Sequence, residues 1–299
     1  MSVICHPNAT SIVLKPPKMV CDKVIHEQIP FPLPNTAHYL VSCGPPRSGK
    51  TSALLSMLTQ TGPRLYSRAF HNVMVIMPRS SIASLKDNPF EGIKEEKIQH
   101  ELSATTLAKV EELAEEHQKK DKFSLLFVDD MSACLKDAEN LKAWNKLINN
   151  RRHLRLSIWC IVQTYKSIPL SNRRTVTHMM LFKPNNRKEG EAIIEELIMM
   201  PPAEWEAYIS HAFGAGEPHS FLFLDVDGQK VYDRNFSLLE CPSGAKTGGA
   251  AFEAPDLPAA APDQNVDPND KKRKRPKDEW RGTAGSTQHG QPGGVGPGR

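Results

Sequence analysis

The 299-residue sequence has little net charge and no long apolar run. Its 38 basic and 34 acidic residues leave a formal charge of +4, which is too small for a protein that binds nucleic acid by overall charge alone. No run of about 18 apolar residues occurs, so a membrane-spanning segment is not expected. The N-terminus lacks a basic start followed by a continuous apolar segment, and a signal peptide is therefore not expected.

Cysteine is also sparse. The six cysteines are scattered and form no C-x-x-C pair, and two of them lie inside apolar, strand-like runs. This usage indicates reduced thiols in a soluble intracellular protein rather than a disulfide framework. The histidines at positions 26, 71 and 117 do not have the spacing of metal ligands, so no structural zinc site is expected.

Glycine and proline are unevenly distributed. Residues 241–299 hold 10 of the 18 glycines and 8 of the 24 prolines, which predicts a disordered tail. Residues 271–277 within it, KKRKRPK, are typical of nuclear import or nucleic-acid binding, with a solvated charge run as the alternative. Residues 1–37 are rich in proline and predict an N-terminal extension laid on the domain, with one strand at Ser11–Leu14. A single folded domain is expected between the two, over residues 38–240.

Short apolar runs alternate with helical patterns between residues 38 and 240, which is typical of a parallel sheet covered by helices. Strands are predicted at Tyr39–Cys43, Val73–Met77, Leu125–Val128, Ser157–Gln163 and Met179–Phe182, and helices at Thr51–Gln60, Thr105–Lys120, Asp137–Asn150, Lys188–Met199 and Pro202–Phe213. Residues 220–236 predict a hairpin turning at Asp227 and Gly228. The predicted fold class is α/β, with a mostly parallel central sheet flanked by helices and a C-terminal β-hairpin.

A phosphate-binding motif follows the first predicted strand. Residues 44–51, GPPRSGKT, match G-x-x-x-x-G-K-[ST] between a strand and a helix, and this context makes a chance match improbable. Backbone N–H groups of such a loop surround phosphate oxygens, and the following helix adds its positive end. We expect Lys50 to pair with the β- and γ-phosphates and Thr51 to ligate Mg²⁺. The predicted nucleotide-binding residues are Gly44, Pro45, Pro46, Arg47, Ser48, Gly49, Lys50, Thr51 and Ser52.

Two adjacent acids, Asp129 and Asp130, follow the apolar run Leu125–Val128. Asp129 is placed to hold Mg²⁺ through water, and Asp130 to orient and deprotonate the attacking water. The alternative for Asp130 is a capping role in the next turn, because Asp-Met-Ser favours turns.

A further apolar strand ends in the amide of Gln163, which could reach the γ-phosphate or the lytic water. The alternative is that Gln163 satisfies a backbone group at the strand end. A strand inserted between the phosphate-loop strand and the acid-bearing strand favours the RecA-like ATPases over the GTPases. The base-reading motif of GTPases, N-K-x-D, is matched only in part, by Asn145-Lys146-Leu147-Ile148, which lacks the acid.

Arginines flank the strand that ends at Gln163. Ring-shaped ATPases complete their sites with an arginine from the next subunit, and the predicted catalytic candidates here are Arg152 and Arg174. The alternative is that such arginines simply end a helix, where cations suit its dipole. The two clusters, together with Lys166 and Lys183, are equally candidates for a DNA-facing surface. The full clusters are Arg151, Arg152 and Arg155 before the strand, and Arg173 and Arg174 after it.

Four segments, GPPRSGKT, LLFVDD, the Arg152-His153 pair followed by LSIWCIVQT, and SFLFLDVDGQKVYDRNF, together resemble the poxvirus-type genome-packaging ATPases of the FtsK-HerA superfamily. These proteins occur in large DNA viruses of eukaryotes, virophages and related elements. The resemblance spans about residues 38–240 and implies a RecA-like P-loop motor that uses ATP and Mg²⁺. By this resemblance, Asp129 is the Walker B aspartate, Asp130 takes the catalytic carboxylate position and Gln163 the sensor position. The superfamily usually has Glu where this chain has Asp130, so an intervening water would extend the shorter side chain.

The resemblance also implies partners. It points to a homo-oligomeric ring that translocates double-stranded viral DNA into a preformed capsid, with a capsid or portal-vertex protein as a further partner and no membrane. The site of action is the host nucleus or a cytoplasmic virus factory, with association with the virion also open. A DNA-dependent ATPase or helicase of viral replication is the alternative, although about 200 residues leave little room for strand-separating elements. A non-enzymatic DNA-binding assembly factor is a third hypothesis, which the intact Lys50, Thr51, Asp129 and Asp130 argue against.

Overall fold

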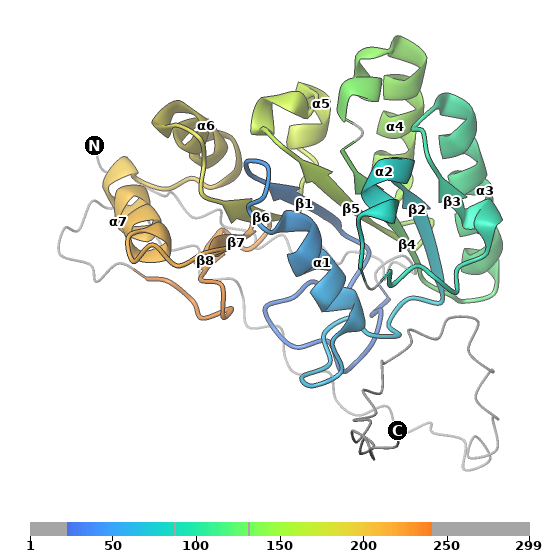
Figure 1. Cartoon of the computed structure of the whole chain (residues 1–299), viewed down its shortest axis with the longest axis horizontal. Coiled ribbons are helices and arrows are strands. Elements are labelled where there is room, and N and C mark those ends of the chain that lie inside the picture. The colour runs from blue at the N-terminus through green and yellow to red at the C-terminus, as the bar shows by residue number, and fades with distance from the viewer. Residues whose placement is uncertain (1–22, 87, 131, 241–299) are drawn as a thin grey trace, which may run out of the picture.

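The predicted apolar runs form one mixed sheet in the computed structural model, which describes residues 23–86, 88–130 and 132–240 (Figure 1). The strands are β1 (Tyr39–Cys43), β2 (Asn72–Ile76), β3 (Ile98–Gln99), β4 (Ser124–Asp129), β5 (Leu156–Val162), β6 (His178–Phe182), β7 (Phe221–Asp225) and β8 (Lys230–Tyr232). Their order across the sheet is β3-β2-β4-β5-β1-β6-β7-β8. The strands from β3 to β6 in this order are parallel, whereas β7 and β8 add an antiparallel edge. The predicted fold class is therefore confirmed.

The position of β5 decides which loops meet. β5 pairs in parallel with β1 on one side and with β4 on the other, as expected for a RecA-like sheet. At the carboxyl ends of these strands, Cys43 lies opposite Val162, and Asp129 lies opposite Ile161. The loops that follow β1, β4 and β5 therefore leave the sheet at the same edge, where ligands of open α/β sheets bind.

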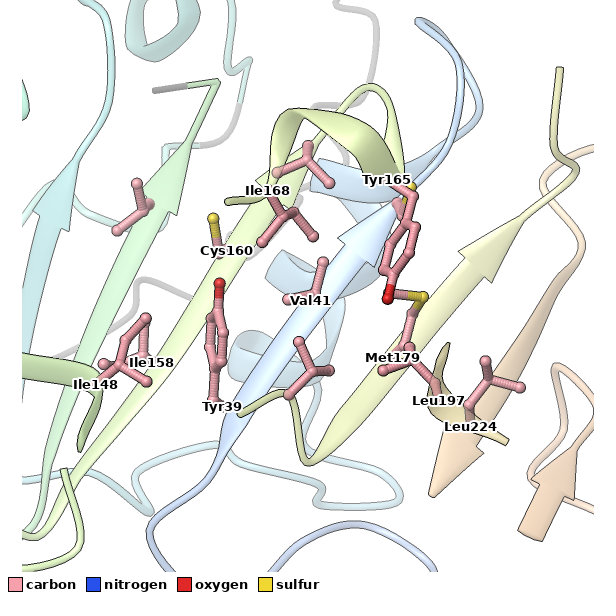
Figure 2. Packing of buried hydrophobic residues seen from close by; sticks show 14 of the residues in the cluster. Tyr39, Val41, Ile148, Ile158, Cys160, Tyr165, Ile168, Met179, Leu197 and Leu224 are labelled. Carbon is pink, nitrogen blue, oxygen red and sulfur yellow. The ribbon is translucent and has the colours of Figure 1, made fainter. Parts of the chain in front are cut away.

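Both faces of the sheet are covered, which explains why its strands are continuous apolar runs rather than alternating ones. In β5, Ile158 and Cys160 point into one core cluster, whereas Trp159 and Ile161 point into the other. Figure 2 shows the first cluster, in which Tyr39 and side chains from several strands pack together on one side of the sheet. Burial on both sides fixes the register of the central strands, because a slip of one residue would exchange the two faces.

The helices divide between the two faces. They are α1 (Lys50–Thr59), α2 (Arg79–Ala83), α3 (Ala104–Lys119), α4 (Ala138–Asn150), α5 (Leu170–Arg173), α6 (Arg187–Leu197) and α7 (Pro202–Phe213), with short 3₁₀ turns η2 (Glu95–Lys97), η3 (Ser132–Lys136) and η4 (Tyr165–Ser167). Buried hydrophobic residues of α3, α4, α6 and α7 belong to the first core cluster, and those of α1 belong to the second. The nucleotide-loop helix α1 thus packs on the face opposite to α3 and α4.

Three long helices begin at side chains that cap them. Ser103, Asp137 and Asn186 accept hydrogen bonds from the backbone N–H three residues further on, at the starts of α3, α4 and α6. Such caps satisfy backbone donors that the helix itself leaves unpaired. They explain why these helices begin within one residue of the predicted positions.

The described part of the N-terminal extension packs on the α1 face. Ile25, Ile29 and Leu33 are buried in the second core cluster, and the hydroxyl of Tyr66 donates to the carbonyl of Pro34 at 2.7 Å. The predicted strand Ser11–Leu14 and the predicted disordered tail lie outside the described residues.

The hairpin forms as predicted at the edge of the sheet. β7 and β8 pair so that Asp225 lies opposite Lys230, and the Asp225 carboxylate accepts from the backbone N–H of Gly228 within the turn. The short strand β3, the short helices α2 and α5, and the 3₁₀ turns η2, η3 and η4 are additional to the predicted elements. Among the described residues, no helix is both long and apolar enough to cross a membrane.

Candidate nucleotide-binding site

The glycines of the phosphate loop are required by backbone geometry. Gly49 has a φ of 100°, in the left-handed region, and a Cβ added there would lie 2.9 Å from Nδ1 of His219. A Cβ added to Gly44 would lie 2.6 Å from the Cβ of Phe182. A side chain at either position would therefore force the loop away from its neighbours.

The loop forms a cradle at the N-terminus of α1. Gly49 is the N-cap, and none of the described residues in the first turn of α1 is acidic, so the positive end of the helix is not neutralised locally. The hydroxyl of Ser48 is buried without a hydrogen-bond partner among the described residues. Pro46, Arg47 and Ser52 are exposed around this cradle. An uncompensated helix N-terminus beside an unpaired buried hydroxyl fits an anion such as phosphate.

The ammonium of Lys50 is folded back onto the loop. Its Nζ donates to the carbonyl oxygens of Gly44 and Pro45, each at 2.7 Å. Burial lowers the pKa of Lys50, while the nearby acids Asp129 and Asp130 oppose that shift. A phosphate group in the cradle would offer this ammonium a charged partner in place of two neutral carbonyls.

Thr51 and Asp129 are 78 positions apart in the sequence but are in contact in the fold. The Thr51 hydroxyl donates to Oδ2 of Asp129 at 3.4 Å. Burial, together with the charge of Asp130, raises the pKa of Asp129 to about 6. A hydroxyl oxygen beside a carboxylate oxygen is a donor set that suits Mg²⁺, so these two residues fit the predicted metal position.

Asp130 and Gln163 meet at the ends of adjacent strands. Gln163 Nε2 donates to Oδ1 of Asp130 at 3.1 Å, and both side chains are exposed. Asp130 has a φ of 53°, in the left-handed region, so its backbone turns sharply away from β4. The sharp turn separates the directions of the two adjacent acids: Asp129 is buried beside Thr51, whereas Asp130 faces solvent beside Gln163.

The arginines of the two clusters have different surroundings. Arg155 is buried, pairs with Asp121 and lies over the ring of Phe123. Arg173 lies 4.9 Å over the ring of Tyr165 and donates to the carbonyls of Ile168 and Lys166. These two arginines stabilise their own subunit.

Arg152 and Arg174 are the exposed members of the clusters. Arg152 precedes the amino end of β5, whereas Gln163 follows its carboxyl end. The six steps between the seven residues of β5, at about 3.3 Å each, separate the two ends by about 20 Å. Arg152 is therefore too far from the phosphate loop of its own subunit to contact a nucleotide there. Arg174 ends α5 at the surface, just before β6.

His219 is a neighbour of the phosphate loop that sequence reasoning missed. It precedes β7, has a φ of 60°, and its Nδ1 lies 3.1 Å from the carbonyl oxygen of Ser48. Since that carbonyl can only accept, Nδ1 carries the proton in this contact. No motif marks a single histidine 171 residues away from its partner in the sequence.

Comparisons with known proteins place this geometry in a family. A model of the family described as the poxvirus A32 protein matches residues 32–197, which include the phosphate loop, both acids, Gln163 and both exposed arginines. A search of curated proteins gives no match.

A solved structure shares the fold. The DNA-packaging ATPase B204 of Sulfolobus turreted icosahedral virus has a TM-score of 0.50 and 15% identity, and the match covers 68% of this chain and 98% of B204. The genome-packaging NTPase B204 of Sulfolobus turreted icosahedral virus 2, solved with AMP, has a TM-score of 0.49 and 14% identity over 66% of this chain and 96% of B204. The family match spans more than half of the sequence, and the chain therefore belongs to the poxvirus A32 protein family of genome-packaging ATPases.

Proposed function

We propose that this protein is a ring-forming motor that couples ATP hydrolysis to the translocation of double-stranded viral DNA into a preformed capsid. The observation that carries the proposal is the meeting of Lys50, Thr51, Asp129, Asp130 and Gln163 at the carboxyl ends of three neighbouring parallel strands. Binding residues alone would serve a nucleotide held as a structural ligand. An exposed acid beside an exposed amide adds groups that can orient and deprotonate a water.

Each residue then has a distinct task. The loop backbone and Lys50 bind the β- and γ-phosphates of ATP, and Thr51 and Asp129 would hold Mg²⁺. When bound, Mg²⁺ would neutralise charge on the phosphate oxygens. Asp130 accepts the proton of the attacking water, and Gln163 orients that water. A neighbouring subunit supplies Arg152 or Arg174.

A cavity supports a contact with the DNA backbone near this site. It has a volume of about 370 Å³ and lies between η3 and η4, the turns that follow β4 and β5. Lys136 and Lys166 line it together with Ser132 and Ser167. Neither lysine forms an ion pair with a carboxylate in the described part of the chain. Such contacts give the sequence-independent attraction to phosphate that a translocating motor needs.

Partners and location complete the proposal. We expect a capsid or portal-vertex protein to hold the ring, and packaging to occur in a cytoplasmic virus factory, as for a poxvirus-type protein, or in the nucleus. The predicted basic block at residues 271–277 lies outside the described residues.

ATP turnover by the purified full-length protein tests the proposal. We expect Mg²⁺-dependent hydrolysis that duplex DNA stimulates. The turnover per subunit should rise with protein concentration as the ring assembles. Lys50→Ala should abolish turnover, whereas Lys142→Ala, which removes an exposed charge from α4, should not. Asp130→Asn should retain ATP binding and lose hydrolysis. Equal rates of ATP hydrolysis in wild type and Lys50→Ala would refute the proposed ATPase activity. Separation of a forked duplex would favour the alternative function as a helicase.

A further inference from the structure

A buried acid on α6 holds the turn that follows Gln163. Glu189 is 9% exposed, and its Oε1 accepts a hydrogen bond from the backbone N–H of Tyr165 at 2.8 Å. Tyr165 is the first residue of η4 and lies two positions after Gln163. The contact therefore fixes the backbone immediately beyond the predicted sensor.

The start of α6 explains why Glu189 reaches across. The side chain of Asn186 caps the helix by accepting from the backbone N–H of Glu189 at 2.9 Å. An acid at this third helical position usually turns back to the N-cap backbone in a capping box. Here the carboxylate instead bonds the backbone of η4, a separate element that precedes β6 in the sequence, whereas α6 follows it. A sequence pattern alone would assign Glu189 to capping.

Other contacts hold the side chain of Tyr165 rather than its backbone. The Tyr165 hydroxyl donates to Oε2 of Glu196 at 2.9 Å, and Arg173 lies over the ring while pairing with Oε1 of Glu196 at 3.1 Å. These groups orient the ring and the far end of the turn. Within η4, the Ser167 hydroxyl donates to the carbonyl of Thr164 at 2.6 Å, and Glu189 bonds the N–H of the same peptide group from a separate element.

Gln163 depends on this backbone because little packing holds it. Its side chain and that of Asp130 are exposed, and their hydrogen bond of 3.1 Å joins two groups that solvent can reach. An exposed amide keeps a defined direction only if the residues around it are fixed. A small displacement of a group that positions a reactant can cost about a hundredfold in rate.

We propose that Glu189 is a positioning residue for ATP hydrolysis, which fixes the η4 backbone so that Gln163 meets Asp130 and the attacking water. The inference rests on the proposed function. Glu189 contacts neither of those two side chains and acts only through the backbone of Tyr165.

Steady-state kinetics of four variants test this role. We expect Glu189→Ala to lower kcat between about tenfold and a hundredfold, with the KM for ATP within about twofold of wild type. Glu189→Gln should stay near wild type, because its amide oxygen can accept the same hydrogen bond. Glu189→Asp keeps the charge but withdraws the carboxylate by one methylene, so it should lower kcat and still fold if Glu189→Ala does not. Glu191→Ala, an exposed acid on the same helix, is the matched control and should keep wild-type kcat.

A double-mutant cycle separates positioning from general stability. If Glu189 acts through Gln163, adding Glu189→Ala or Glu189→Asp to Gln163→Ala should lower kcat no further. Additive losses, or an unchanged kcat in both Glu189→Ala and Glu189→Asp, would overturn the inference while leaving the proposed function intact. A wild-type protein that hydrolyses no ATP would overturn both.

Discussion

Removing the charge of the buried Asp129 should have opposite effects on stability and on activity: the protein should become more stable but lose ATP turnover. Burial and the neighbouring charge of Asp130 raise the pKa of Asp129 from 3.8 to about 6. A carboxyl with a raised pKa binds more protons in the folded state than in the unfolded state between these two values. The free energy of unfolding should therefore fall as the pH rises from about 4, and the cost should be complete above pH 6.

The size of the effect follows from the shift. At about 1.36 kcal/mol per pKa unit, ionising Asp129 costs the ligand-free protein up to about 3 kcal/mol at pH 8, and roughly half of that at pH 5. Asp129→Asn removes the charge and keeps an oxygen that can accept from the Thr51 hydroxyl. The variant should gain stability by about this amount at pH 8, and the gain should vanish near pH 4.

Urea unfolding in EDTA, without nucleotide, at several pH values measures this gain. Asp130→Asn is the control: its side chain is exposed, so its own gain should be small and should come from relieving Asp129. The same Asp129→Asn protein should lose Mg²⁺-dependent ATP turnover. An Asp129→Asn protein that is no more stable than wild type at pH 8 would refute the reasoning, because Asp129 would then carry no penalty for its charge.

Three further outcomes follow from the structure. Gly49→Ala should lower the free energy of unfolding by about 1 to 2 kcal/mol, because its backbone is left-handed, and should abolish ATP binding. Gly216→Ala, with a φ of 69° and open space around it, should lower that free energy by a similar amount but leave ATP binding unchanged. A fluorescent-nucleotide titration measures the binding. If Arg174 acts across a subunit interface, mixing Arg174→Ala with Lys50→Ala subunits should restore part of the ATP turnover that each lacks alone; no recovery at any ratio would exclude that role. Deletion of residues 241–299 should leave thermal unfolding and basal turnover unchanged, because the backbone N–H of Leu239 still bonds to β8 at the end of the domain. A loss of solubility would contradict the predicted boundary.

The central elements were predictable because their signals are local. Strands buried on both faces are continuous apolar runs, and helices with capping side chains begin where the pattern changes. The two residues of β3 are too few to show a period, and α2 contains no buried residue among those described. The contacts that these short elements make, rather than their composition, determine their structure.

The site divides in the same way. The meeting of Thr51, Asp129 and Gln163 could be expected, because parallel strands bring their carboxyl ends to one edge. Glu189 and His219 could not, since each reaches its partner from an unrelated element. The sequence pattern around Glu189 indicates only helix capping, and His219 belongs to no motif. The sequence also treats all arginines of a cluster alike, whereas only burial distinguishes Arg155 from Arg152.

The two outermost strands of the sheet have a consequence for how copies of this chain assemble. β3 has two residues and β8 has three, and β8 is partly covered by the bridge between Tyr232 and Leu238. Strands this short offer few unpaired backbone groups to another chain. We therefore expect the described domains to associate through side chains rather than by extending the sheet from one subunit to the next. Such contacts can slide and re-form during a catalytic cycle, whereas a ladder of backbone hydrogen bonds would lock neighbouring subunits in one register.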